Sequence, residues 1–318
     1  MRSRNLLMSG MASLALWSSW SHGQFVHGIT QPTFGTNLPA VFLTDTTTGA
    51  SVFQFNATAS VFPATAPGIG GLAADEPNNR LFASIRNGAQ DDIWSIAYAG
   101  YAGTRLTTVR RPGLTTFMSV DGLAYDTRRS VLYGSRTTGG STGPEALVSI
   151  NIVTGETAVI VEYETTATSL FTFGAIDYDP LTDLIYLIDE DDTGGRNIYS
   201  VNPAVASPPL VLVSALPAII TDVDGLAAGQ GKLYLVSDGP DIGSTAGVEG
   251  NGGNHYVYDI ASGSFSILGP TPYPEYNTSA LGRINPSAGA AFAPGLIPEP
   301  SSLSLLAVAG LSLVRRRR

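Results

Sequence analysis

The sequence predicts an all-β fold, a β-propeller of about five four-stranded blades. Three observations lead to this prediction. A unit of roughly fifty residues recurs along the chain, each copy reads as four short strands, and turn-forming residues are frequent, with 36 glycines and 20 prolines. Because one four-stranded unit cannot bury its own faces, we expect the units to pack around a common axis.

The first half of the unit is a strand that carries a small residue and usually ends in an acidic turn. Aligning its four copies at Gly71, Gly122, Ala175 and Gly225 gives spacings of 51, 53 and 50 residues. The copies read GIGGLAAD, VDGLAYD, FGAIDYD and VDGLAAG. We expect this strand to line the central channel, since small residues suit a crowded axis.

The second half of the unit is an alternating strand, a polar turn and another strand. The turns Asn151–Gly155 and Asp259–Gly263 match well, and Asn or Asp followed by Gly supplies the left-handed backbone of a hairpin. Apolar and polar residues alternate on the flanking strands, which is typical of half-buried sheets. Each unit therefore contains four strands.

The two ends of the repeat region complement each other. The segment from Ala40 matches only the second half of the unit, and the segment from Thr278 can supply the first half. We expect the two ends to complete one blade and close the ring, which gives five blades. Residues 24–40 and 241–254 could together supply a sixth blade. A β-solenoid or sandwich is the rival fold. The repeats over most of residues 40–293 resemble SMP-30-like and NHL-like bacterial propellers, which implies architecture rather than activity.

The composition excludes several classes of function. There is no cysteine, so disulfides, thiol catalysis and cysteine-ligated metals are excluded. Outside the arginines at the two ends, 11 basic residues face 26 acidic ones. This net charge near −15 repels nucleic acid and anionic lipid, and it can attract cations.

The N-terminus reads as a signal peptide over residues 1–23, followed by a lead over 24–39. Arg2 and Arg4 precede an apolar run from Leu6 to Trp17, and small or polar residues continue to Gly23. We expect an N-terminal signal helix, cleavage after Gly23, export of the chain and a propeller over residues 40–294.

The C-terminal segment, residues 295–318, has three parts in order. Pro298, Glu299 and Pro300 come first, then an apolar, helix-prone stretch Leu303–Val314, and the chain ends in four arginines, Arg315, Arg316, Arg317 and Arg318. We expect a transmembrane-like helix here, although it is shorter than the about 20 residues of a full span. The arginines would stay cytoplasmic.

This C-terminal segment closely resembles the PEP-CTERM sorting signal, which consists of a Pro-Glu-Pro motif, a hydrophobic stretch and an arginine cluster. The resemblance implies recognition of Pro298, Glu299 and Pro300 by an exosortase, a membrane enzyme that cleaves near the motif. It further implies a secreted or cell-envelope protein, associated with exopolysaccharide or surface proteins and in the membrane only through this segment before processing. An uncleaved tail anchor is the alternative.

Acidic loops suggest one metal site. Ca²⁺ takes about six to eight oxygen ligands, and Asp189, Asp191 and Asp224 are its predicted ligands because their loops and strand should meet at one rim of the channel. Asp91 and Asp92 are expected on the same rim. The spacing is not that of an EF-hand, and a solvated acidic loop is the alternative.

No catalytic residues are predicted. After removal of the signal peptide, His27 and His255 are the remaining histidines, and His255 begins a strand, which favours packing over catalysis. GIGG from Gly68 lacks the strand-loop-helix context of a phosphate loop and is read as a turn. The recurrent tyrosines are expected in the core: Tyr125, Tyr133, Tyr178 and Tyr186. The sequence thus predicts a non-catalytic binding or structural protein; a Ca²⁺-dependent propeller hydrolase or lactonase is the alternative.

Overall fold

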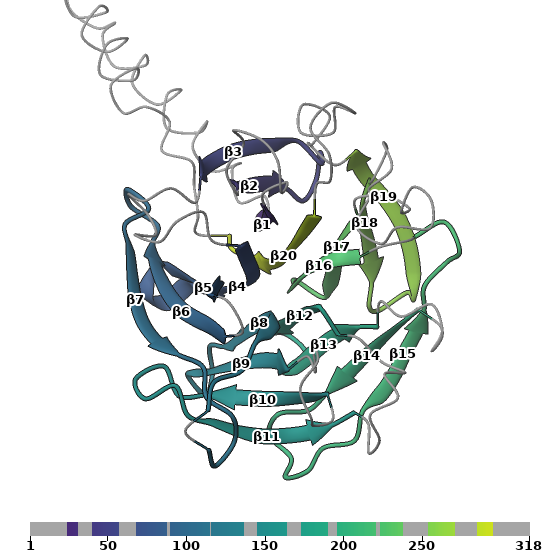
Figure 1. Cartoon of the computed structure of the whole chain (residues 1–318). Helices are drawn as coiled ribbons and strands as arrows, with labels where there is room; N and C mark the ends of the chain where they lie inside the picture. The colour runs from purple at the N-terminus through teal and green to yellow at the C-terminus, as the bar shows by residue number, and fades with distance from the viewer. Residues whose placement is uncertain are drawn as a thin grey trace, which may run out of the picture.

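The fold is seen in a computed structural model of the chain, which describes residues 24–30, 40–56, 68–87, 90–114, 116–136, 145–163, 173–189, 196–220, 223–237, 254–270 and 285–294. Within these residues, twenty strands form five four-stranded antiparallel sheets arranged as blades around a centre (Figure 1). The predicted all-β propeller with five blades is confirmed. The described part contains one helical element, the 3-10 turn η1 (Glu76–Asn78).

Four blades are each made from one continuous stretch of chain, with the first strand innermost. Blade 1 contains β4 (Gly68–Asp75), β5 (Arg80–Asn87), β6 (Gln90–Ala97) and β7 (Gly103–Thr108). Blade 2 contains β8 (Val120–Asp126), β9 (Val131–Arg136), β10 (Ala146–Ile150) and β11 (Thr157–Glu162). Blade 3 contains β12 (Ala175–Asp179), β13 (Leu184–Ile188), β14 (Asn197–Val201) and β15 (Val211–Ala215). Blade 4 contains β16 (Val223–Gly229), β17 (Lys232–Ser237), β18 (Asn254–Asp259) and β19 (Ser264–Pro270).

The closing blade combines the two ends of the propeller, as expected, but divides them differently. Its order is β20 (Asn285–Phe292), β1 (Gln24–Thr30), β2 (Ala40–Asp45) and β3 (Ser51–Asn56), so the C-terminal part supplies one strand and the N-terminal part three. The propeller therefore begins at Gln24, inside the segment predicted to precede it. β1 pairs with β20 through register shifts, and such irregular pairing leaves no regular alternation in the sequence.

The innermost strands approach one another so closely that they require glycine. A Cβ on Gly71 would lie 2.7 Å from the backbone nitrogen of Leu123, and one on Gly122 would lie 2.6 Å from the carbonyl oxygen of Gly174. GIGG lies in a strand, as its place in the repeat predicted, and its interpretation as a turn is wrong. These glycines belong to β4, where they permit close approach to the next inner strand.

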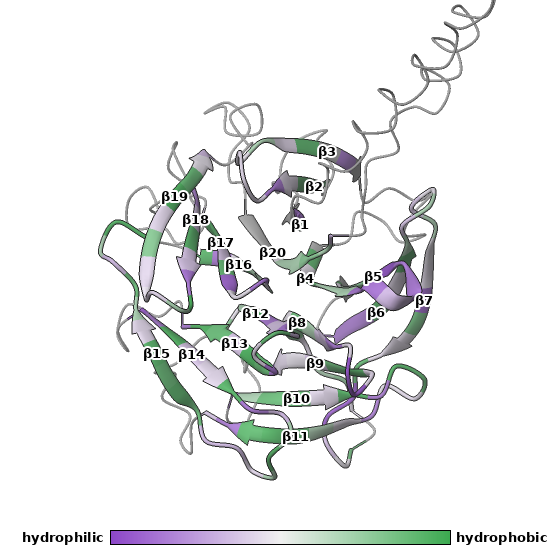
Figure 2. Cartoon of the chain, turned by 180° about the vertical axis from the view of Figure 1, so that it is seen from behind, coloured by the Kyte–Doolittle hydropathy of each residue, from purple (hydrophilic) through white to green (hydrophobic). Residues whose placement is uncertain are grey.

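The hydrophobic core is divided among the contacts between neighbouring blades. One cluster joins Val26 of β1 to Leu72 of β4 and Trp94 of β6, and similar clusters occur between the other blades. Hydrophobic segments alternate with polar ones along the strands in Figure 2. The four recurrent tyrosines are buried within these clusters, as predicted: Tyr125, Tyr133, Tyr178 and Tyr186.

The aspartates that end the inner strands of blades 2 and 3 build the following turns. The carboxylate of Asp126 accepts hydrogen bonds from the backbone amides of Arg128 and Arg129, at 2.9 and 3.0 Å. Asp179 accepts from the turn amides of blade 3 in the same way. These turns all lie at one end of the channel, because the inner strands run in the same direction.

No helix in the described residues is long and apolar enough to cross a membrane. The predicted signal helix (1–23) and the predicted C-terminal sorting segment (295–318) lie outside these residues.

Candidate ligand pocket at one end of the channel

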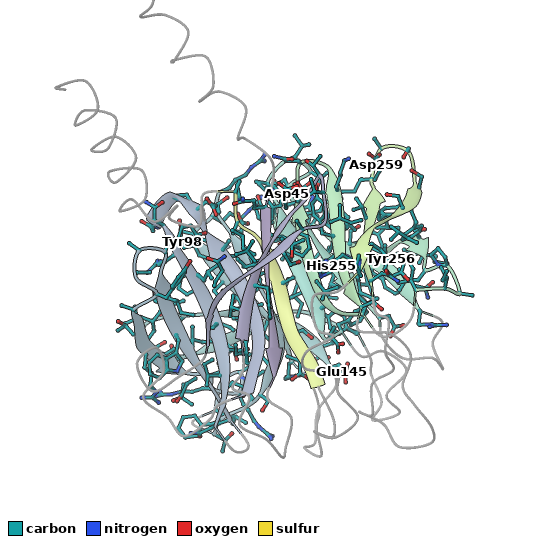
Figure 3. All side chains as sticks on the ribbon, turned by 90° about the horizontal axis from the view of Figure 1, so that it is seen from above. Asp45, Tyr98, Glu145, His255, Tyr256 and Asp259 are labelled. Carbon is teal, nitrogen blue, oxygen red and sulfur yellow. The ribbon has the colours of Figure 1, made fainter. Side chains whose placement is uncertain are left out.

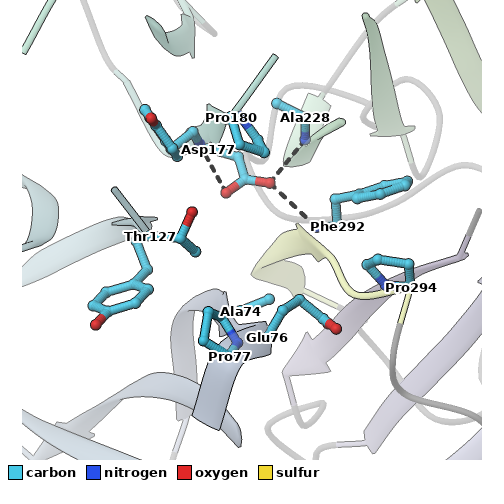
Figure 4. A pocket seen from close by; sticks show the side chains of 11 residues that line it. Ala74, Glu76, Pro77, Thr127, Asp177, Pro180, Ala228, Phe292 and Pro294 are labelled. Atoms are coloured by element: carbon cyan, nitrogen blue, oxygen red, sulfur yellow. Dashed lines mark hydrogen bonds between the residues drawn. The ribbon is translucent and has the colours of Figure 1, made fainter. Parts of the chain in front are cut away.

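A pocket of about 290 Å³ lies where the inner strands end, and all five blades contribute to its wall (Figure 4). We call it the channel pocket. Its lining comes from the last residues of the inner strands and the first residues of the turns that follow: Ala74, Glu76, Pro77, Tyr125, Thr127, Asp177, Tyr178, Pro180, Ala228, Phe292 and Pro294.

Asp177 departs from the residue that the other inner strands share at its position. It lies two residues after Ala175, and the corresponding residue of the other inner strands is alanine: Ala73, Ala124, Ala227 and Ala291. The position of β20 in this alignment follows from packing, since Gly289 lies against Gly71 and Leu72 of the next inner strand. One blade therefore places a carboxyl group where four place a methyl group.

The Asp177 carboxylate is held by three backbone amides from three blades. Its Oδ1 accepts a hydrogen bond from the amide of Tyr178 at 2.8 Å. Its Oδ2 accepts from the amides of Ala228 at 2.8 Å and Phe292 at 3.2 Å (Figure 4). An inner strand has no further strand on its channel side, so its inward amides need another acceptor. Asp177 provides it for β16 and β20.

The charge of Asp177 is poorly compensated. The residue is 4% exposed. Burial raises the pKa of its carboxyl group well above the usual value; the three amide hydrogen bonds lower it, and the nearby Asp179 charge raises it further. Glu76 is a second carboxyl group in the lining, where it accepts a hydrogen bond from the Tyr98 hydroxyl at 2.6 Å. Among the described lining residues there is no lysine, arginine or histidine.

Rigid and apolar side chains form the rest of the wall. Pro77, Pro180 and Pro294 follow the inner strands of three blades and are exposed. Tyr125 and Tyr178 contribute buried aromatic surface. The channel pocket therefore combines two carboxyl groups with walls that change little in shape, and this arrangement suits binding of a small ligand.

The predicted calcium ligands belong to the opposite end of the channel. Figure 3 separates the two ends, with Asp45 and Asp259 at the end that carries the turns and Glu145 at the other. Asp224 is the second residue of β16, and Asp189 follows β13 beside the start of β12. Asp189 is buried and Asp224 half-buried.

Asp191, the third predicted calcium ligand, lies outside the described residues. In the part of the chain that the structure describes, no group of three or more histidine, aspartate or glutamate side chains is positioned to hold a metal ion. The calcium site at Asp189, Asp191 and Asp224 stays a prediction.

Asp91 and Asp92, expected on the same rim, have structural partners. Asp91 accepts a hydrogen bond from the amide of Val120 at 2.8 Å and so links blade 1 to blade 2. Asp92 forms an ion pair of 2.8 Å with Arg105 and accepts a hydrogen bond of 2.5 Å from the Thr108 hydroxyl. These contacts explain both carboxylates without a ligand.

His255 packs in the core, as its place on a strand predicted (Figure 3). Its ring meets the ring of Phe25 edge-on, with 5.4 Å between centroids. Burial lowers the pKa of His255 to about 3, so the imidazole is neutral at neutral pH. This environment fits packing between blade 4 and the closing blade.

Sequence reasoning missed Asp177, although a signal was present. The aligned copies of the first strand show an aspartate in one and alanine in the others. The predicted ligands Asp189, Asp191 and Asp224 did not include this aspartate. A departure from the repeat within an inner strand was the more informative feature.

No protein-family model and no curated protein sequence matches the chain. Among solved structures, a chain of the nidogen/laminin complex is similar over 85% of this chain and 98% of that chain, with 13% identity and a TM-score of 0.49. TolB from Acinetobacter baumannii is similar over 78% of this chain and 53% of that chain, with 13% identity and a TM-score of 0.46. A protein from Lactobacillus plantarum is similar over 85% of this chain and 99% of that chain, with 12% identity and a TM-score of 0.44. These values carry no information about ligand or activity.

Proposed function

We propose that this chain is an exported cell-surface or extracellular protein whose propeller binds a partner or ligand rather than catalysing a reaction, and that an exosortase processes its C-terminus. The observation that carries the sorting part is the order of three features in residues 295–318. Pro298, Glu299 and Pro300 precede an apolar stretch, and an arginine cluster follows.

The boundaries of the propeller support this proposal. β1 begins at Gln24, directly after the expected cut at Gly23, and β20 ends at Phe292, ahead of Pro298. Cleavage at both places would leave every strand of the closing blade intact. A propeller closed by strands from both ends of the chain is therefore compatible with removal of both flanking segments.

The channel pocket supports a binding role. Its one buried carboxylate is fixed by three amides, and prolines and aromatic rings form most of the wall. A fixed carboxylate within rigid, largely apolar walls suits the positioning of a small ligand. Exopolysaccharide and surface proteins are the partners that the sorting signal implies.

The test is the mass of the mature protein in an exosortase-bearing bacterium that expresses the full chain. We expect an N-terminus at Gln24 and a C-terminus near Pro298. A Glu299→Ala variant should accumulate with its tail in the membrane fraction, whereas Ser302→Ala, outside the motif, should be processed normally. Retention of residues 295–318 in the wild-type protein would overturn the sorting proposal.

A further inference from the structure

We propose that the channel pocket binds an organic ammonium group, with Asp177 as its counter-charge and Glu76 as a second acidic contact. This inference deepens the proposed binding role by naming the class of ligand. It does not depend on sorting, because the pocket lies wholly within the propeller.

The first argument is charge. Asp177 and Glu76 both line the pocket, and among the described lining residues no basic side chain opposes them. The raised pKa of Asp177 reflects burial without a compensating cation. A bound ammonium ion would supply that positive charge and favour the ionised carboxylate.

The second argument is the departure from the repeat. The other four inner strands have alanine at this position and therefore bury no charge there. A buried carboxylate is unfavourable unless it is paired, and the three amide bonds compensate for burial only in part. A ligand that uses this carboxylate explains why blade 3 alone carries Asp177.

The third argument is the shape and chemistry of the wall. Tyr125, Tyr178 and Phe292 offer aromatic surface, and the prolines offer rigid apolar surface. A cationic head on a short hydrocarbon chain can contact carboxylates and aromatic faces together. The volume of about 290 Å³ suits a group of this size rather than a long polysaccharide.

A divalent metal ion fits these walls less well. Ca²⁺ needs about six to eight oxygen ligands, whereas two carboxyl groups and the Thr127 hydroxyl are the acidic and hydroxyl side chains of the lining apart from its two tyrosines. The ammonium group itself has two sources, a small free amine or the lysine side chain of a partner protein. Both present the same chemistry to Asp177.

Calorimetric titration of the full chain, purified in a mild nonionic detergent at constant ionic strength, tests the proposal. The probes are n-butylammonium chloride, Nα-acetyl-lysine N-methylamide and, as a neutral control of similar size, n-butanol. At least one amine should bind about tenfold or more tightly than butanol. Binding of butylammonium alone identifies a free amine as the source, and binding of the lysine derivative alone or of both admits a lysine side chain. Binding of neither amine, or equal binding of butanol, overturns the proposal.

Matched variants locate the site. Asp177→Ala reproduces the residue of the other four blades and should weaken amine binding by about tenfold or more. Glu76→Gln keeps an acceptor for the Tyr98 hydroxyl and should weaken binding several-fold. Glu156→Gln removes an equal charge from an exposed side chain outside the pocket and should leave binding unchanged.

The melting curve of each variant shows whether it is folded. If Asp177→Ala fails to fold, Glu76→Gln decides the result, because Glu76 is half-buried and the substitution keeps the size of its side chain. Unchanged amine affinity in a folded Asp177→Ala protein, or in Glu76→Gln when that variant must decide, overturns the assignment. A failed sorting assay would leave this result untouched, and a failed titration would leave the sorting assay untouched.

Discussion

The inner strand of blade 3 differs from the other four inner strands at two aligned positions, with Ala175 in place of glycine and Asp177 in place of alanine. All five run side by side around the channel with small residues facing their neighbours, and four of them have alanine where β12 has Asp177. The shared residues satisfy packing, since larger side chains would collide with the next strand. The residue that is not shared brings a buried charge to the channel pocket. Repetition thus identifies what the fold needs, and departure from it identifies a candidate site.

The largest expected effect on stability comes from replacing a glycine that lets neighbouring inner strands approach closely. Gly71→Ala places a Cβ 2.7 Å from the backbone nitrogen of Leu123, and backbone atoms cannot move aside easily. We expect the free energy of unfolding to fall by about 3 kcal/mol. Urea denaturation measures this value. Gly269→Ala is the control, because its nearest atom would lie at 3.5 Å, and it should change stability by less than about 0.5 kcal/mol. Equal effects of the two variants would contradict the packing argument.

The next effect concerns Asp177 itself. Asp177→Ala leaves the amides of Ala228 and Phe292 without this acceptor, so at acid pH we expect a loss of about 2 kcal/mol in the free energy of unfolding. The folded pKa of Asp177 is raised, so its contribution is fully present below the unfolded pKa of about 3.9 and is lost as pH rises through the folded pKa. The difference between wild type and variant should shrink as pH increases. A difference that grows with pH would contradict this account.

A third prediction compares Asp177 with Asp183 of the same blade, because the pKa of Asp177 is raised and that of Asp183 is lowered. Arg129 donates to Asp183 through both terminal nitrogens, at 2.7 and 2.8 Å, and joins blade 2 to blade 3. Its guanidinium holds the pKa of Asp183 well below the usual value. Stability from this pair is therefore present above pH of about 4 and is lost as pH falls.

Arg129→Ala removes this pair together with the ion pair of 2.5 Å between Arg129 and Asp126. It should lower the free energy of unfolding by about 1 kcal/mol near neutral pH, and the effect should fade in acid. Thermal melts across pH measure it. Arg128→Ala is the control, since Arg128 is more exposed and its nitrogen lies 3.5 Å from Asp183, and it should change stability by less than about 0.5 kcal/mol. If Arg129→Ala and Asp177→Ala show the same pH trend, the assigned charge states are wrong.

The smallest expected effect lies at the opposite end of the channel. Calcium binding at Asp189, Asp191 and Asp224 should raise Tm by about 2 °C, and Asp191→Asn should remove this rise. Magnesium chloride at equal ionic strength is the control. A Tm that does not respond to calcium would remove the predicted site and leave these carboxylates as solvated or structural groups.

The sequence predicted the architecture well because the repeat is dictated by packing. Gly71, Gly122 and Gly225 recur at nearly equal spacing since each inner strand must approach the next, and this regularity predicts both strand order and ring closure. β1 was not predicted, because its pairing with β20 contains register shifts that disturb the alternation.

The candidate site could be predicted only in part. An acidic site is expected from the surplus of aspartate and glutamate. The sequence does not tell at which end of the channel that site lies. Asp177 contacts Ala228 of the next blade, 51 residues away, and Phe292 of the closing blade, 115 residues away, and these contacts form only when the blades pack together and the ring closes. The sequence therefore predicted a site at Asp189, Asp191 and Asp224, whereas the structure brings Asp177, Glu76 and Phe292 together in one pocket at the opposite end of the channel.

The most direct test of the central claim is a crystal structure of the protein grown with n-butylammonium chloride. The account predicts electron density for the amine in the channel pocket, with its nitrogen about 3 Å from a carboxylate oxygen of Asp177. An amine bound elsewhere, or water alone beside Asp177 in crystals saturated with the amine, would contradict it.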